Sequence, residues 1–176
     1  MSDINDKIFA KNILKSMYPN LENIDTSSKT EKPDLHFMRN KIGVEVTKAW
    51  DDLDGMFYAS LNGEIKNKEK LFEPNDMLLP NKIIRRIEDI DNIVNKISER
   101  IGAKTNLAPK YYNENPWMHK LYLFVIVDAL LERYDLEKVS NKISNQTRKM
   151  FNKIFFATPK CIFIYNGWDF AKFDYR

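Results

Sequence analysis

Two acidic residues, Asp34 and Glu45, stand in a segment whose pattern predicts a β-hairpin. Residues 34–38 and 42–47 have the composition of two short strands joined by a tight polar turn. Alternation with a period of two places each carboxylate on the face of its strand opposite the apolar side chains. Two carboxylates that face the same way on neighbouring strands can bind a hard divalent cation such as Mg²⁺. The ordinary alternative is a half-exposed hairpin with one acidic residue on the polar face of each strand.

The residues around this hairpin resemble a known nuclease signature. Pro33-Asp34, followed by Glu45-Val46-Thr47 at the end of a strand, is similar to the signature of the PD-(D/E)XK (restriction-endonuclease-like) nuclease superfamily. The resemblance implies that Asp34, Glu45 and the Val46 carbonyl bind the metal, which would be Mg²⁺ or alternatively Mn²⁺. It further implies hydrolysis of DNA or RNA phosphodiester bonds, with nucleic acid as the partner.

The third motif residue departs from the superfamily pattern, because Thr47 stands where a lysine is usual. Lys48 follows directly, but a shift of one residue turns a side chain to the other side of a strand. Some branches with a Glu-x-Thr motif recruit a basic residue from the following helix, in front of a stretch that contains tyrosine. The resemblance therefore adds Thr47 and Lys104 to the candidate catalytic residues, with Arg100 as the second choice for the basic group.

The basic residues in question lie at helical spacing. Lys96, Arg100 and Lys104 are four residues apart, so they line one flank of a helix, and Tyr111-Tyr112 follow. A solvated helix flank explains the same spacing. A helix that ends at Gly102 would also displace Lys104, and both alternatives stay open from the sequence.

The remaining pattern predicts an α/β fold in a single domain, 1–176. Apolar residues at helical spacing alternate along the chain with short apolar runs typical of strands. The expected elements are helices at 9–17, 82–101 and 135–154 and strands at 34–38, 42–47, 121–127 and 161–165. An irregular insertion is expected at about 51–80. Together with the resemblance, this order implies a restriction-endonuclease-like αβββαβ core with a mixed central sheet flanked by helices.

Composition sets only broad limits on function. The chain of 176 residues is 43% hydrophobic and 30% charged, which is typical of a globular protein. Its net charge of +3 neither requires nor excludes a nucleic-acid partner, because phosphate binding depends on local clustering. The single cysteine, Cys161, excludes an internal disulfide. No apolar run approaches the roughly 20 residues that span a bilayer. We therefore expect a cytoplasmic protein without a membrane partner, and a homodimer is compatible with the sequence.

Three functions remain open from the sequence. The first is a metal-dependent nuclease. The second is a catalytically degenerate PD-(D/E)XK fold that serves as a nucleic-acid-binding or protein-binding module, an option that the missing motif lysine keeps open. The third is a small α/β accessory or inhibitor protein in which the hairpin carboxylates are incidental.

Overall fold

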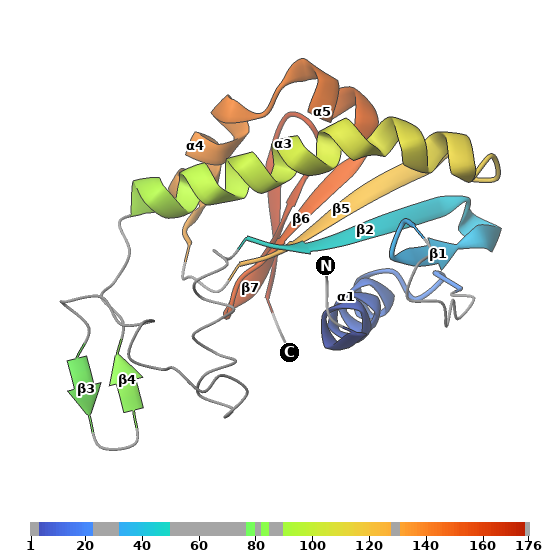
Figure 1. Ribbon diagram of the computed structural model, residues 1–176. Helices are drawn as coiled ribbons and strands as arrows, with labels where there is room; N and C mark the ends of the chain where they lie inside the picture. Colours follow the sequence, from blue (N-terminus) through green and yellow to red (C-terminus); the bar gives the residue numbers. More distant parts are fainter. Residues whose placement is uncertain are drawn as a thin grey trace, which may run out of the picture.

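The chain folds around a six-stranded sheet with the strand order β1-β2-β5-β6-β7-β8 (Figure 1). The computed structural model describes residues 4–22, 32–49, 77–79, 82–84, 90–127 and 131–174. The helices are α1 (Ile4–Met17), the 3₁₀ helix η1 (Met38–Asn40), α3 (Ile90–Glu114), α4 (Arg133–Lys142) and α5 (Asn145–Met150). The strands are β1 (Leu35–Phe37), β2 (Ile42–Lys48), β3 (Met77–Leu79), β4 (Lys82–Ile84), β5 (Lys120–Ile126), β6 (Lys153–Ala157), β7 (Cys161–Tyr165) and β8 (Phe170–Asp174).

The sheet is mixed, as the sequence predicts. The β2–β5 and β5–β6 pairs are parallel, and the β1–β2, β6–β7 and β7–β8 pairs are antiparallel. Parallel neighbours need a crossover connection, and here α3 precedes β5 while α4 and α5 lie between β5 and β6. The short strands β3 and β4 form a separate two-stranded sheet. The expected insertion at 51–80 otherwise falls outside the described residues.

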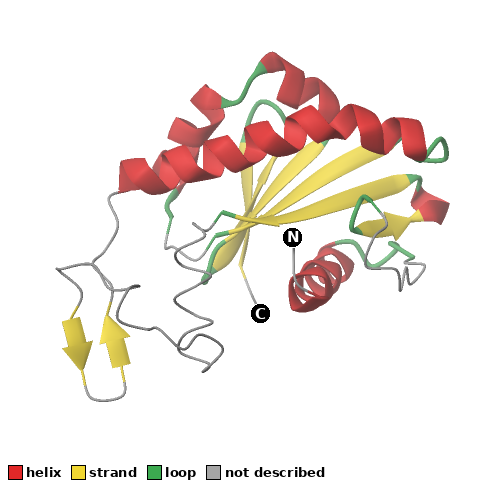
Figure 2. Ribbon diagram, in the orientation of Figure 1, coloured by secondary structure: helices red, strands yellow, loops and turns green. Residues whose placement is uncertain are grey.

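Each face of the sheet carries its own hydrophobic core. Figure 2 shows α3, α4 and α5 on one face and α1 on the other. Strand β5 serves both cores, because Leu121, Leu123 and Val125 pack toward α3 while Tyr122 and Phe124 pack toward α1. The prediction that 121–127 is a central strand covered on both sides is thus confirmed. None of the described helices is long and apolar enough to cross a bilayer.

The helix expected at 82–101 is wrong at both ends. Residues 82–84 form β4, and α3 begins at Ile90 and continues to Glu114. The apolar stripe that ends at Ile101 continues as Thr105, Ala108 and Tyr111, all of them buried. A threonine and an alanine do not stand out in an apolar pattern, although the Thr105 hydroxyl is satisfied by the Ile101 carbonyl at 2.9 Å. The helix was therefore predicted too short, because the small side chains of Thr105 and Ala108 do not stand out in a search for apolar periodicity.

Gly102 does not end α3, and this gives a first prediction. A Cβ at Gly102 would meet nothing within 4 Å, so Gly102→Ala is expected to raise the free energy of unfolding by about 0.5–1 kcal/mol. Gly167 provides the control, because it has an equally open surrounding but a φ of +100°, and Gly167→Ala is expected to lower stability. Urea denaturation measures both. A Gly102→Ala variant less stable than the wild type would contradict a continuous α3.

The helix expected at 135–154 is also wrong, because it is two short helices followed by a strand. Between α4 and α5, Ile143 takes an extended conformation, and Ser144 caps α5 by accepting a hydrogen bond from the Thr147 N–H at 3.1 Å. Ile154 then belongs to β6 and is buried there. It had fitted the helical spacing by coincidence. The edge strand β8 was not expected from the sequence either.

Candidate functional site

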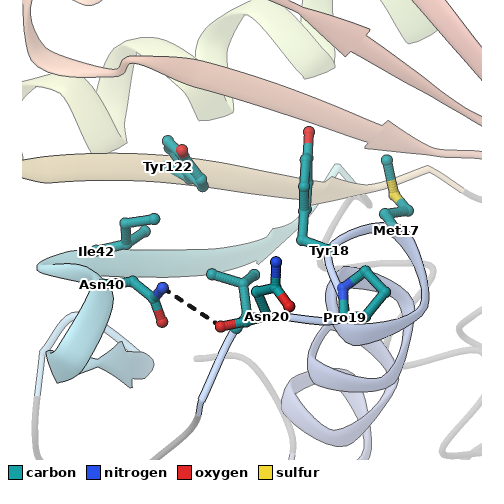
Figure 3. A pocket seen from close by; sticks show the side chains of 8 residues that line it. Met17, Tyr18, Pro19, Asn20, Asn40, Ile42 and Tyr122 are labelled. Atoms are coloured by element: carbon teal, nitrogen blue, oxygen red, sulfur yellow. Dashed lines mark hydrogen bonds between the residues drawn. The ribbon is translucent and has the colours of Figure 1, made fainter.

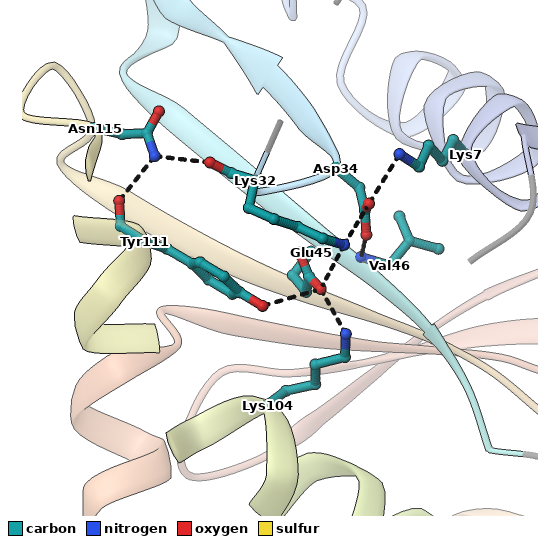
Figure 4. A network of polar contacts seen from close by, with 8 residues as sticks. All are labelled: Lys7, Lys32, Asp34, Glu45, Val46, Lys104, Tyr111 and Asn115. Carbon is teal, nitrogen blue, oxygen red and sulfur yellow. Dashed lines mark hydrogen bonds and ion pairs between the residues drawn. The ribbon is translucent and has the colours of Figure 1, made fainter. Parts of the chain in front are cut away.

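The β1–β2 hairpin brings Asp34 and Glu45 together beneath the same head group (Figure 4). In the antiparallel register Leu35 pairs with Val44, so Asp34, directly before β1, and Glu45 of β2 come next in that register. Lys32 Nζ lies 2.8 Å from Asp34 Oδ1 and 3.2 Å from Glu45 Oε1. Both carboxylate side chains have 0% exposed surface. Burial of two neighbouring carboxylates is costly without compensating charge.

Three lysines from three segments supply that compensating charge. Besides Lys32, Lys7 of α1 places its Nζ 3.0 Å from Asp34 Oδ1, and Lys104 of α3 places its Nζ 2.6 Å from Glu45 Oε1. Lysine side chains from helices on opposite faces of the sheet thus converge on the two carboxylates (Figure 4). Among the described residues, three ammonium groups against two carboxylates leave a formal charge of +1 on this cluster, a surplus that favours binding of an anion.

The hydrogen bonds of the two carboxylates are unequal. Asp34 Oδ2 accepts a hydrogen bond from the Val46 N–H at 2.9 Å. Glu45 Oε1 accepts from Lys32, Lys104 and the Tyr111 hydroxyl, the last at 3.2 Å. Glu45 Oε2, by contrast, is buried and has no hydrogen-bond partner among the described residues. Such an oxygen costs free energy unless a ligand satisfies it.

Electrostatics keep the charged forms of Asp34 and Lys32 stable. Burial alone would raise the pKa of Asp34, but the hydrogen bond and charge of Lys32 and the Val46 N–H outweigh it and lower that pKa. Burial would likewise lower the pKa of Lys32, but Asp34 and Glu45 together raise it. Burial and the charge of Glu45 raise the pKa of Tyr111, so its phenol stays a neutral donor.

Two small features hold the ends of this cluster in place. A Cβ at Gly43 would lie 2.5 Å from Pro33 Cγ and 2.2 Å from Met118 Sδ, so only glycine lets Pro33 pack against β2 directly before Asp34. Asn115, which follows the last residue of α3, donates its side-chain amide to the Lys32 carbonyl at 2.7 Å. These two contacts therefore hold the backbone of Lys32 and Pro33, directly before Asp34.

The sequence candidates have different positions relative to this cluster. Lys104 reaches Glu45, whereas Arg100, one turn earlier, is exposed and is not among the groups that contact Glu45. Thr47 is buried, and in the described structure it makes no hydrogen bond to either carboxylate. Lys48 pairs with Asp6 of α1 at 2.9 Å, on the face opposite Glu45, as alternation predicts.

Three residues of the cluster were missed from the sequence. Lys32 stands only two positions before Asp34, in the bend that precedes β1, so its nearness along the chain was the signal. Tyr111 follows Lys104 by seven residues, which is two helical turns and hence the same helix face. Those two signals were present in the printed sequence. Lys7 gives no such signal, because only the packing of α1 brings it to Asp34.

A separate cavity lies on the α1 face of the sheet (Figure 3). Its volume is about 310 Å³, and its lining includes Tyr18, Asn40, Ile42 and Tyr122. Ile42 and Tyr122 belong to the core beneath α1, whereas Glu45 contacts side chains of α3. The cavity is therefore not part of the carboxylate cluster.

The donor set of the cluster fits a magnesium ion without a third acidic residue. Within the described ranges no three His, Cys, Asp or Glu side chains gather into a metal-binding group. Mg²⁺, however, is commonly held by one or two carboxylates together with water and substrate phosphates. Since the N–H and C=O of one strand residue point to the same side, the Val46 carbonyl lies on the Asp34 side of β2. Glu45 Oε2, which has no hydrogen-bond partner among the described residues, is a further oxygen that can bind a cation.

Comparisons with protein-family models, curated proteins and solved structures gave no match to this chain.

Proposed function

We propose that this protein is a metal-dependent nuclease that hydrolyses DNA or RNA phosphodiester bonds at the Asp34–Glu45 pair. The observation that carries the proposal is the pair itself: two carboxylates without exposed surface, adjacent on a hairpin, with Lys104 at one of them. A fold that buries two neighbouring acids gains little stability from them. Perturbed, clustered titratable groups of this kind are typical of functional sites.

Magnesium would be held by Asp34, Glu45 and the Val46 carbonyl. Bound there, it would supply an activated water and neutralise charge on the phosphate. The unsatisfied Glu45 Oε2 supports this assignment, because metal coordination would remove the cost of burying that oxygen. Manganese is the expected substitute, since it prefers the same oxygen ligands.

The basic residues around the pair would act on the substrate. The ammonium of Lys104 lies at Glu45. Lys104 would replace the usual motif lysine, whose position is occupied by Thr47, and would stabilise negative charge on the phosphate in the transition state. Lys7 and Lys32 would bind neighbouring phosphate oxygens, for which the surplus positive charge of the cluster is suited. The neutral Tyr111 hydroxyl would keep Glu45 in position.

The element order supports a restriction-endonuclease-like core, with one departure. The order α1-β1-β2-α3-β5 follows the helix, strands, helix and strand of that core. The superfamily core has three strands before the second helix. In the described ranges only β1 and β2 of the main sheet precede α3, since β3 and β4 form a sheet of their own.

A specific observation favours a second candidate, a catalytically degenerate module that binds nucleic acid or protein. The Lys32 ammonium already bridges both carboxylates. A chain that had lost its metal could keep the pair neutralised in this way. Such a module would bind nucleic acid in a salt-dependent manner without cleaving it.

Cleavage assays separate the two candidates. Purified protein is incubated with single-stranded and double-stranded DNA and RNA, in Mg²⁺, in Mn²⁺ and in EDTA, and Asp34→Asn serves as the control for a contaminating nuclease. The proposal predicts cleavage of at least one substrate that requires the metal and is lost in the variant. Intact substrates under every condition, or equal cleavage by the variant, would refute it.

A further inference from the structure

The position of Lys32 sets it apart from the other two lysines of the cluster. Lys7 pairs with Asp34 and Lys104 pairs with Glu45, but Lys32 contacts both carboxylates, at 2.8 and 3.2 Å. Its ammonium therefore lies where a cation shared by Asp34 and Glu45 would lie (Figure 4).

The charge balance of the cluster argues against keeping Lys32 there when a divalent cation is bound. In the part of the chain that the structure describes, the three lysines already exceed the two carboxylates by one formal charge. A divalent ion added to all three would raise the excess to three, in a region where both carboxylates are shielded from solvent. Withdrawal of the Lys32 ammonium lowers that repulsion and vacates the position between the two acids, while Lys7 stays at Asp34 and Lys104 at Glu45.

The Lys32 side chain can move away from the two carboxylates while its backbone stays in place. Its carbonyl is held by Asn115 at 2.7 Å, so the backbone stays in place, while its side chain is 28% exposed. A lysine side chain has a flexible four-carbon stem and a strongly hydrated head group, so the ammonium can turn to solvent without movement of the backbone. The carboxylates have no exposed surface, so a cation from solvent reaches them only where a head group moves aside.

We propose that the Lys32 ammonium is a resident counter-cation of the Asp34–Glu45 pair that leaves it when a divalent cation binds, so that Lys32 lowers the metal affinity of the site. This inference rests on the proposed function, since it names a competitor at the same carboxylates. Once withdrawn, the ammonium remains tethered beside the metal ligands, where it is available to a substrate phosphate.

Calorimetric titration with Mn²⁺ alone, on the full chain, tests the inference without reference to activity. Lys32→Gln removes the positive charge, and the affinity of the variant for Mn²⁺ is expected to rise at least about tenfold. The reason is that two unit charges at hydrogen-bonding distance interact with a free energy larger than the one that corresponds to a tenfold change in affinity. Lys32→Arg keeps the charge and is expected to bind no more tightly than the wild type. Lys48→Gln is the matched control: Lys48 is also 28% exposed and also ion-paired, to Asp6 at 2.9 Å, and its loss should leave Mn²⁺ affinity unchanged.

The outcomes are distinguishable. Tighter binding by Lys32→Gln but not by Lys48→Gln supports the inference. Binding by Lys32→Gln where the wild type binds no Mn²⁺ also supports it, while it favours the degenerate module over the nuclease. Equal or weaker binding by Lys32→Gln, next to a wild type that binds, overturns the inference alone. No binding by either protein overturns the inference together with the proposed metal site. Thermal unfolding in EDTA verifies that each variant is folded.

Discussion

Replacing Glu45 with glutamine is expected to lower the free energy of unfolding by about 3 kcal/mol, in the absence of any metal. The substitution keeps the shape of the side chain but removes the negative charge that Lys32 and Lys104 share. Three ammonium groups would then face the single carboxylate of Asp34. The two lysines at Glu45 are 28% and 19% exposed, so they can turn partly toward water, which places the effect at the lower end of the range for buried pairs.

A double-mutant cycle identifies the cause of this loss. Lys104→Met alone leaves Glu45 with Lys32 and Tyr111, whereas Glu45→Gln/Lys104→Met removes the surplus cation together with the anion. The double variant is expected to be more stable than the sum of the two single effects by about 1–3 kcal/mol. Glu137→Gln is the control, because its pair with Arg133 is solvent-exposed and its loss should change stability little. Additive effects within error would show that Glu45 and Lys104 do not interact in solution.

The second large effect concerns catalysis. Under the proposed function, Lys104→Met should lower kcat for phosphodiester cleavage by about 10²–10³, the usual cost of removing one group that stabilises transition-state charge. The change in KM should be much smaller, since Lys7 and Lys32 still attract the phosphates. Steady-state kinetics on the best substrate of the cleavage assay measures both constants.

Arg100→Met is the matched control for Lys104→Met. Arg100 lies one turn earlier on α3, carries the same charge and is exposed, so its loss should change kcat less than about threefold under this account. Equal losses in the two variants would point to a general effect of positive charge on nucleic-acid binding. A Lys104→Met variant with wild-type kcat would remove Lys104 from the proposed catalytic set.

The parts of the fold that could be predicted are those in which the type and size of the residues indicate how they are buried. Strand β5 is apolar on both faces, and only a central strand needs that. The apolar stripe of α3 can be recognised in the sequence as far as Ile101 because its residues are large. It cannot be recognised at Thr105 and Ala108, which are equally buried but small. Strand β6 was not predicted because Ile154 falls at helical spacing from the preceding apolar residues. In the structure the helix is already interrupted at Ser144, which caps α5.

The candidate site divides in the same way. Asp34, Glu45 and Lys104 could be proposed from motif and spacing. Lys32 could have been added because it lies two residues before Asp34, and Tyr111 because it lies seven residues after Lys104 on one helix. Lys7 could not, because its contact with Asp34 depends on how α1 packs beneath β1 and β2, which no local pattern specifies. The bridging position of Lys32 likewise emerges only from the folded hairpin.

The most direct test of a metal site at Asp34 and Glu45 is anomalous diffraction from crystals of the protein soaked in Mn²⁺. We predict an anomalous peak within coordination distance of one oxygen of each carboxylate, with the Lys32 ammonium displaced toward solvent. Crystals that show no peak at saturating Mn²⁺, with Lys32 still bridging Asp34 and Glu45, would contradict this prediction.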